Sequence, residues 1–209
     1  ARKGAEEFQR PWAGMSGQPV DADLAASLAM DLPEGMVISD LHAESPFAKA
    51  GFRVGDVITH VDGEVVNSPS EMVFRMTVAG LDSIATITRL RGTEREQLEV
   101  PMPPAPNQPP ADPIQLDERT ALPGLALARI NPQVISRLGL PLSAEGVVVT
   151  NPGPYAGRGG VQPGDLLMAV NGQAVSAPAD VAAILSNSGR WIQLEIQRGG
   201  RAMVLRFRL

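Results

Sequence analysis

Few residues of this 209-residue chain are of types that carry out hydrolytic chemistry. Ser188 stands in the tripeptide Asn187-Ser188-Gly189, and a serine becomes a nucleophile when a histidine and a carboxylate activate it. The two histidines are His42 and His60, and the absence of cysteine excludes a thiol nucleophile and disulfide bonds. We expect Ser188 to lie in a helix stop and turn, and both histidines to be structural or surface residues without metal-ligand spacing. The sequence therefore predicts no catalytic residue, no metal site and no cofactor in this chain.

The strongest signal is an internal repeat. Residues 51–66, GFRVGDVITHVDGEVV, and residues 160–175, GVQPGDLLMAVNGQAV, align without a gap and are identical at six of sixteen positions. In each copy Gly-Asp opens an apolar run, which predicts strands over 57–61 and 166–170. Asp-Gly and Asn-Gly then favour a type I′ hairpin turn, and a proline-led helix start follows at Pro69 and Pro178.

The repeat extends outward on both sides. Residues 35–39 and 146–150 predict glycine-started strands, and residues 86–92 and 193–199 each end in an Arg-Gly turn before a final strand. Upstream, Trp12-Ala13-Gly14-Met15 corresponds to Leu122-Pro123-Gly124-Leu125. Two domains of roughly 100 residues are expected, each large enough for its own core. The predicted boundaries are a connecting segment 1–10, a first domain 11–102, a linker 103–113 and a second domain 114–209.

Composition and the linker limit the function classes. The net charge of −5 and the scattered basic residues argue against nucleic acid as a partner, and no apolar run is long enough to span a membrane. Residues 101–113 contain seven prolines, which predicts an extended, semi-rigid spacer between the domains. A ligand for a proline-recognising domain is the alternative interpretation of this segment.

The order of these motifs resembles the bacterial type of PDZ domain. The resemblance rests on the apolar-Gly-apolar loop, Ser45-Pro46-Phe47-Ala48, Ala50-Gly51, Gly55-Asp56, the Val-Asp-Gly hairpin and the proline-capped helix. It implies a mainly β fold with short helices (α+β), as two PDZ-like, partly open β-barrel or sandwich domains in tandem. The tandem arrangement resembles the C-terminal half of HtrA/Deg-type serine proteases, which are trypsin-like quality-control enzymes of the bacterial envelope.

The resemblance implies a peptide-binding site in the first domain. In PDZ domains an extended peptide adds as a strand to a sheet edge, and loop amides receive its terminal carboxylate. Carried over by motif, the expected site comprises Trp12, Ala13, Gly14, Met15, Ser16 and Gly17, with Val73 and Met76 on the facing helix. Met72 is expected in the core, and a core role for Met76 is an equal alternative to a pocket wall.

The second copy departs from this pattern. Pro123 stands in the carboxylate loop, and proline has no N–H to donate. Its corresponding groove residues are Leu122, Gly124, Leu125, Ala126, Ala182 and Leu185, and Gly153-Pro154-Tyr155-Ala156 replaces the Ser-Pro-x-Ala segment. We therefore expect weak or no carboxylate capture by the second domain, and a role in packing against other subunits or partners.

The resemblance also implies a biological setting. The chain is expected to be a C-terminal fragment of a periplasmic protease that forms a homo-oligomer. It would capture C termini or unfolded polypeptide segments and regulate a catalytic domain upstream of residue 1. The alternatives are a non-enzymatic tandem-PDZ scaffold of envelope proteins and the PDZ region of an intramembrane metalloprotease.

Overall fold

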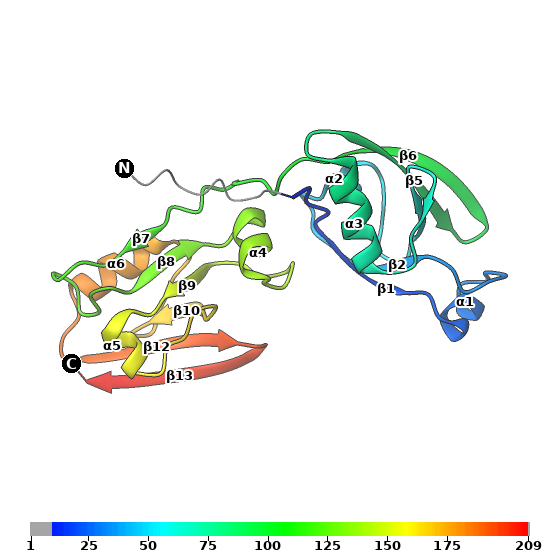
Figure 1. Cartoon of the computed structure of the whole chain (residues 1–209). Helices are drawn as coiled ribbons and strands as arrows, with labels where there is room; N and C mark the ends of the chain where they lie inside the picture. Colours follow the sequence, from blue (N-terminus) through cyan, green and yellow to red (C-terminus); the bar gives the residue numbers. More distant parts are fainter. Residues whose placement is uncertain (1–9, 209) are drawn as a thin grey trace. The chain divides into compact units, whose positions relative to one another are not determined.

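The computed structural model describes residues 10–208, and Figure 1 shows its elements. The chain divides into two compact units between Pro106 and Asn107, and each unit is described by itself. The predicted connecting segment, residues 1–10, lies almost wholly outside the described residues.

The first unit is an open antiparallel sheet with three helices. Its strands lie in the order β1-β2-β3-β5-β6, and β4 pairs with β3. The strands are β1 (Met15–Pro19), β2 (Met36–Leu41), β3 (Val57–Val61), β4 (Glu64–Val65), β5 (Ile84–Arg91) and β6 (Glu94–Pro101). The helices are α1 (Ala22–Ser27), α2 (Pro46–Lys49) and α3 (Pro69–Ala79).

The second unit repeats this plan and adds one strand. Its order is β13-β12-β10-β9-β8-β7, with β11 on β10, and the added strand β7 lies beyond β8. The strands are β7 (Ile114–Gln115), β8 (Ala126–Arg129), β9 (Val147–Asn151), β10 (Leu166–Val170), β11 (Gln173–Ala174), β12 (Trp191–Arg198) and β13 (Arg201–Arg208). The helices are α4 (Pro132–Leu138), α5 (Gly153–Arg158) and α6 (Pro178–Ser186). The mainly β class is confirmed, and both sheets are open rather than closed into barrels.

The repeated hairpins form where the sequence predicts them. Strands β3 and β10 have the predicted bounds, and each is followed by two residues with positive φ. These φ values are 50° and 80° at Asp62 and Gly63, and 49° and 78° at Asn171 and Gly172. Positive φ at both central residues is the requirement of a type I′ turn, which explains why Asp-Gly and Asn-Gly stand there.

Each unit buries its own core. In the first unit Ile38, Ile58 and Ile87 from the sheet pack with Met72 and Met76 from α3. In the second unit the largest cluster contains Leu122, Leu125, Leu127, Leu167, Val181, Leu185, Ile192 and Leu194. Without a helix packed on it, one apolar face of each sheet would be exposed to solvent. Helices α3 and α6 cover these faces.

The proline-rich segment is fastened to both units. Met102, just after β6, is fully buried in the first core, and its N–H donates to Ser83 O at 2.9 Å. Ala111 is buried in a second-unit cluster, and its N–H donates to Asn107 Oδ1 at 3.0 Å. The segment forms no helix, as expected from its prolines, and its buried residues Met102 and Ala111 belong to the cores of the first and the second unit respectively.

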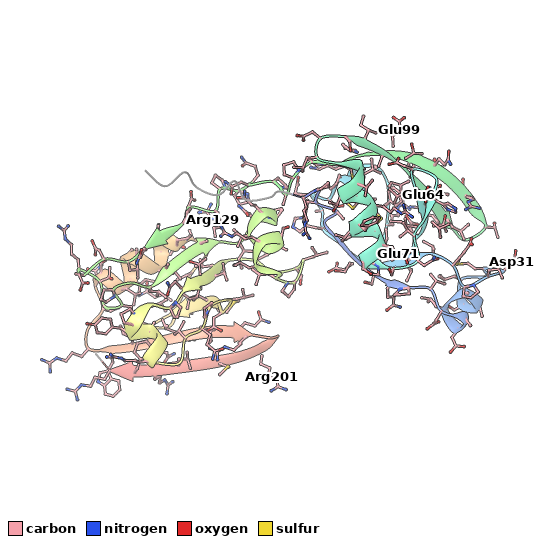
Figure 2. The ribbon with its side chains drawn as sticks, viewed as in Figure 1. Asp31, Glu64, Glu71, Glu99, Arg129 and Arg201 are labelled. Atoms are coloured by element: carbon pink, nitrogen blue, oxygen red, sulfur yellow. The ribbon has the colours of Figure 1, made fainter. Side chains whose placement is uncertain are left out.

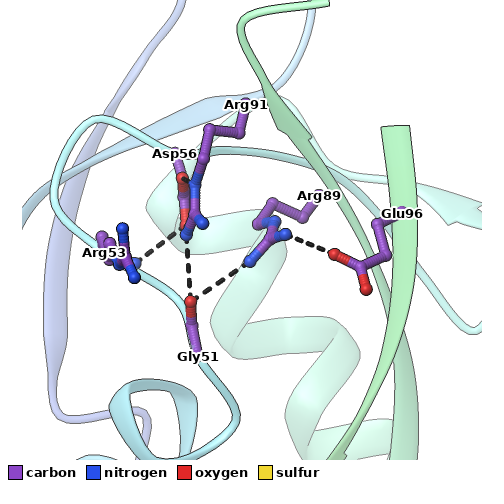
Figure 3. A network of polar contacts seen from close by, with 6 residues as sticks. All are labelled: Gly51, Arg53, Asp56, Arg89, Arg91 and Glu96. Carbon is purple, nitrogen blue, oxygen red and sulfur yellow. Dashed lines mark hydrogen bonds and ion pairs between the residues drawn. The ribbon is translucent and has the colours of Figure 1, made fainter. Parts of the chain in front are cut away.

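A buried ion pair recurs in both units and explains the invariant Gly-Asp of the repeat. Asp56 is 2% exposed, and its carboxylate accepts from Arg91 Nε at 2.6 Å and from Arg91 Nη2 at 2.8 Å (Figure 3). Arg91 Nη2 also donates to Gly51 O at 2.9 Å, and the Arg53 N–H donates to Asp56 at 2.8 Å. The hydrogen bond to Asp56 raises the pKa of Arg91 above its ordinary value.

The second unit has the same arrangement. Asp165 is 1% exposed and accepts from Arg198 Nε at 2.6 Å, while Arg198 Nη2 donates to Gly160 O at 2.7 Å. The guanidinium group holds a carboxylate at two points and keeps donors for a carbonyl, which lysine cannot do. We call each set an Asp-Arg clamp; it joins the loop before β3 or β10 to the strand β5 or β12.

We predict that Asp56→Ala destabilises the first unit by about 2–3 kcal/mol. The change leaves the Arg53 N–H and the part-buried Arg91 without their acceptor. Differential scanning calorimetry of the full chain should show one transition lowered, while the transition of the second unit stays in place. Asp56→Asn, which keeps one acceptor oxygen, should have a smaller effect. An unchanged first transition in Asp56→Ala would contradict this role.

Helix α6 begins without the capping hydroxyl that starts α3. In α3 the Ser68 Oγ accepts from the Glu71 N–H at 3.2 Å, whereas Ala177 has no such group. Asp180 compensates by reaching back: its Oδ2 accepts from the Ser176 and Ala177 N–H groups, both at 2.9 Å. These two bonds lower the pKa of Asp180 below its ordinary value.

The Asp180 contribution should depend on pH. Because its pKa is lower in the folded than in the unfolded chain, the stabilisation is present above about pH 4 and is lost as pH falls through the folded pKa. Asp180→Asn should therefore cost about 1 kcal/mol at pH 7 and progressively less below pH 4. Urea unfolding of the second unit at pH 7, 4 and 2.5 measures this. A cost independent of pH would show that the charge is not involved.

Candidate functional site

Strand β1 presents an edge that the described residues leave unpaired. It is the last strand of its sheet, paired only with β2 within residues 10–208, and α3 contacts it (Figure 1). An unpaired strand edge offers a row of backbone N–H and C=O groups to another extended chain. We call this the β1 edge.

The loop before β1 is built around Gly14. Gly14 has φ of +59°, and a Cβ there would lie 2.7 Å from a ring atom of Trp12 and 3.0 Å from Ser45 Cβ. The Trp12 ring is buried and contacts the His42 ring edge-on at 5.5 Å between centroids, and the backbone N–H of Trp12 donates to Pro103 O at 2.9 Å. Only glycine fits this backbone conformation and this space.

Ser45 anchors the loop, a role that the sequence analysis did not assign. Its fully buried Oγ donates to Ala13 O at 2.5 Å and accepts from the Phe47 N–H at 3.1 Å, which caps α2. The Gly14 carbonyl is also held, because the His42 N–H donates to it at 2.8 Å. The Ser-Pro pair at a helix start indicates that Ser45 caps α2. The sequence gives no indication of its contact with a loop residue 32 positions away.

Two loop amides remain available. Within residues 10–208, the N–H groups of Ala13 and Gly14 have no hydrogen-bond partner, whereas the Trp12 N–H is used by Pro103. Adjacent amides around a positive-φ glycine form a concave donor pair suited to an anion such as a carboxylate. The loop can therefore supply two donors, not three.

The expected helix residues separate into two environments. Val73 is 48% exposed on α3, whereas Met76 is 2% exposed and packs with Met72 in the core. Of the loop and strand residues, Met15 and Gly17 are half-buried and Ser16 is exposed. Of the two predicted helix residues, Val73 thus keeps exposed apolar surface and Met76 does not, and Met15 keeps part of its surface on β1.

The second unit has a different edge. Strand β7 pairs antiparallel with β8, the strand that corresponds to β1, and covers the edge that β1 leaves free. Leu122, Leu125 and Leu185 are fully buried, while Gly124, Ala126 and Ala182 are half-buried. Where Ser45 anchors the first loop, the second loop has direct backbone packing: a Cβ on Gly153 would lie 2.6 Å from Gly124 C.

The residues considered for hydrolytic chemistry occupy structural positions. Ser188 follows α6, donates to Ile184 O at 2.8 Å and accepts from Asn171 Nδ2 at 2.8 Å. His60 lies on β3 beside Thr59 Oγ1 at 3.0 Å, and His42 Nδ1 accepts from the Glu44 N–H at 3.0 Å. Among residues 10–208 no group of three or more His, Asp or Glu side chains is placed to hold a metal ion.

Comparison with protein families gives the same assignment for both units. Residues 14–102 match one model of the PDZ domain, and residues 146–198 match a second PDZ model. The chain is a tandem pair of PDZ domains. The β1 edge, Gly14 and α3 of the first PDZ domain thus lie within the matched region, and Trp12 and Ala13 directly precede it. None of the helices in residues 10–208 has the length and apolar character needed to cross a bilayer.

Relatives match nearly the whole chain. It is 31% identical over 182 residues to a probable periplasmic serine endoprotease DegP-like from Brucella suis, covering 86% of this chain and 34% of the relative. A protein of the same name from Rhizobium meliloti is 30% identical over 213 residues, covering 94% and 40%. The chain thus spans between about a third and two fifths of the length of the curated relatives it matches.

Two solved structures each match about half of this chain. One is the HtrA3 PDZ domain bound to a phage-derived ligand (FGRWV), at 17% identity and a TM-score of 0.39, covering 45% of this chain and 86% of that chain. Another is the HtrA-type protease AlgW with a decapeptide, at 22% identity and a TM-score of 0.43, covering 47% and 30%.

We predict that Ser45→Ala lowers the unfolding free energy of the first PDZ domain by about 2 kcal/mol. It removes the cap of α2 and leaves the Ala13 carbonyl without its donor. Asp21→Ala is the matched control, because Asp21 caps α1 through the Leu24 N–H at 2.8 Å without touching the loop. Asp21→Ala should cost about 1 kcal/mol or less. Equal costs in urea unfolding would show that the loop contact contributes nothing.

Proposed function

We propose that the chain is the peptide-binding, regulatory region of a periplasmic DegP-like serine endoprotease, and that its first PDZ domain binds extended polypeptide at the β1 edge. The observation that carries the proposal is the unpaired edge of β1 beside α3, preceded by the free Ala13 and Gly14 amides. The names of the relatives support the periplasmic setting and the catalytic domain elsewhere in the protein. Capture of C termini or unfolded segments would regulate that domain, in a parent that assembles as a homo-oligomer.

The β1 edge favours a short ligand. In the second PDZ domain Leu125 and Arg129 bond outward to Leu116 and Ala111, and Leu127 between them lies opposite Ile114. The counterparts of Leu125, Leu127 and Arg129 in the first domain are Met15, Gly17 and Pro19, and both strands shift register at the same point, before Gly17 and Leu127. Since Pro19 has no N–H, strand addition should end near Gly17, after about four ligand residues.

The surroundings favour an apolar terminal side chain. Helix α3, which contacts β1, carries the half-exposed Val73, and β1 carries the half-buried Met15; methionine adapts to varied partners. A terminal carboxylate would then accept from the Ala13 and Gly14 amides, while the ligand backbone pairs with Met15 and Gly17.

Titration of C-terminal peptides tests the proposal. Tetrapeptides with apolar C-terminal residues should bind the full chain, amidation should weaken them by tenfold or more, and extension beyond four residues should add little. Isothermal titration calorimetry gives the affinities. Binding that is insensitive to amidation would replace carboxylate capture by capture of internal unfolded segments. Absence of binding would favour a scaffold role for the pair of domains.

A pair of helix variants locates the site. Val73→Lys should weaken binding about tenfold or more, because it places a charge beside the apolar side chain of the ligand. Val78→Lys is the matched control: Val78 is 67% exposed on the same helix, five residues on and therefore turned to a different face. Equal losses in the two variants would contradict the proposed position of the ligand.

A further inference from the structure

We propose that residues 114–116, Ile114-Gln115-Leu116, are a built-in ligand that closes the peptide-receiving edge of the second PDZ domain. The proposal rests on the proposed function in one respect: it takes the same edge of the repeated sheet to receive peptides in both domains. We call residues 114–116 the closing segment.

The closing segment pairs with β8 as an added antiparallel strand. Ile114 lies opposite Leu127 and Gln115 opposite Ala126. The Leu116 N–H donates to Leu125 O at 2.8 Å, and the Gly124 N–H donates to Leu116 O at 2.8 Å. The Gly124 amide, the counterpart of the free Gly14 amide, is thereby occupied.

The side chains of the closing segment alternate as in a bound peptide. Leu116 is 5% exposed and belongs to the core cluster that includes Leu122, Leu125 and Leu185. Ile114 is half-buried against the same cluster, whereas Gln115 between them is exposed. The position that an apolar ligand side chain would fill is therefore taken by Leu116.

Asn131 binds the residues that precede the closing segment, through a polar contact that the first domain lacks. Asn131 is 3% exposed, and its Nδ2 donates to Asn107 Oδ1 and to Pro109 O, both at 2.7 Å. Its Oδ1 caps α4 by accepting from the Val134 N–H at 2.9 Å. The counterpart in the first domain is Asp21, whose carboxylate caps α1 in the same way but has no N–H to donate.

Arg129 of β8 adds two further contacts. The Arg129 N–H donates to Ala111 O at 2.7 Å, at the position where the first domain has Pro19. The Arg129 side chain, labelled in Figure 2, pairs with Asp112 at 3.6 Å. The stretch from Asn107 to Leu116 is thus attached to the second unit at several points along its length.

The chemistry of the closing segment identifies what could replace it. The segment is internal, because the chain turns at Asp117, whose carbonyl accepts from the Thr120 N–H at 3.1 Å. The edge is therefore suited to internal extended segments with apolar side chains at alternate positions, not only to C termini. A peptide binds only when the closing segment is displaced, so its apparent affinity falls by the fraction of open molecules.

The test follows a blocked peptide on the full chain by NMR. The probe is acetyl-Ala-Asp-Pro-Ile-Gln-Leu-Asp-Glu-amide, which has the sequence of residues 111–118. The amide signals of Gly124 and Leu127 report on the second domain, and those of Gly14 and Gly17 on the first. The wild-type chain should show no shift at Gly124 and Leu127, and Leu116→Ala should bind the probe there at least about tenfold more tightly.

Three further variants make the test specific. Leu205→Ala is the control: it truncates a leucine that packs on the same core cluster but lies on β13. It should not release the closing segment or increase binding of the probe. Asn131→Asp keeps the cap of α4 and removes both donors to Asn107 and Pro109. It should therefore increase the affinity for the probe, but less than Leu116→Ala does. Gln115→Cys with Ala126→Cys, in a chain without cysteine, should form one cross-strand disulfide that abolishes the binding gained by Asn131→Asp until it is reduced.

The outcomes separate this inference from the proposed function. It is overturned if the wild-type chain binds the probe at Gly124 and Leu127 as tightly as the opened variants. It is equally overturned if the folded Asn131→Asp and Leu116→Ala variants show no shift there. If Leu116→Ala fails to fold, Asn131→Asp and its disulfide-locked form decide the question. Failure of the proposed function appears separately, as no response of Gly14 and Gly17 to apolar C-terminal tetrapeptides.

Discussion

The Asp-Arg clamp is the interaction on which the rest of each domain depends. Asp56 and Asp165 are almost fully buried, and a buried carboxylate is tolerated only when charge and hydrogen bonds compensate its desolvation. Arg91 and Arg198 supply both and also bind a loop carbonyl, so the loop before β3 or β10 has one position on the sheet. The hairpin and the helix after it follow directly from that loop. The loop position therefore also determines where α3 lies beside β1 and where α6 lies beside β8. This is a physical reason why Gly-Asp and Arg-Gly recur in both copies.

The sequence predicted the elements whose causes are local. Turn dipeptides, proline-led helix starts and apolar runs specify the hairpins, α3 and α6 without help from distant residues. It did not predict β7, because Ile114-Gln115 is two residues long, follows a run of prolines and becomes a strand only through its pairing with β8. The sequence left open whether Met76 lines a pocket or lies in the core, because the buried face of a helix depends on the sheet that it packs against.

For the second domain, the structure adds a physical reason to the one that the sequence suggested. The sequence suggested weak carboxylate capture because Pro123 lacks an N–H. In the structure the Gly124 N–H, which could still donate to a ligand carboxylate, donates instead to Leu116 O of the same chain. The difference between the domains can be traced to single groups: an amide at Asn131 against a carboxylate at Asp21, and an N–H at Arg129 against none at Pro19.

The two domains also give two solutions to the problem of an exposed strand edge. An uncovered edge invites pairing with any extended chain, which for a polypeptide-binding domain is a function and otherwise a liability. In β1 the edge is kept but shortened, since Gly17 offers no side chain to a partner and Pro19 ends the ladder. In the second domain the corresponding residues are Leu127 and Arg129, and both have a backbone N–H, so an uncovered edge there could pair with a longer extended chain. Residues 114–116 cover this edge. Because those residues continue directly from the proline-rich segment, the connection between the domains also covers the edge that would otherwise need protection.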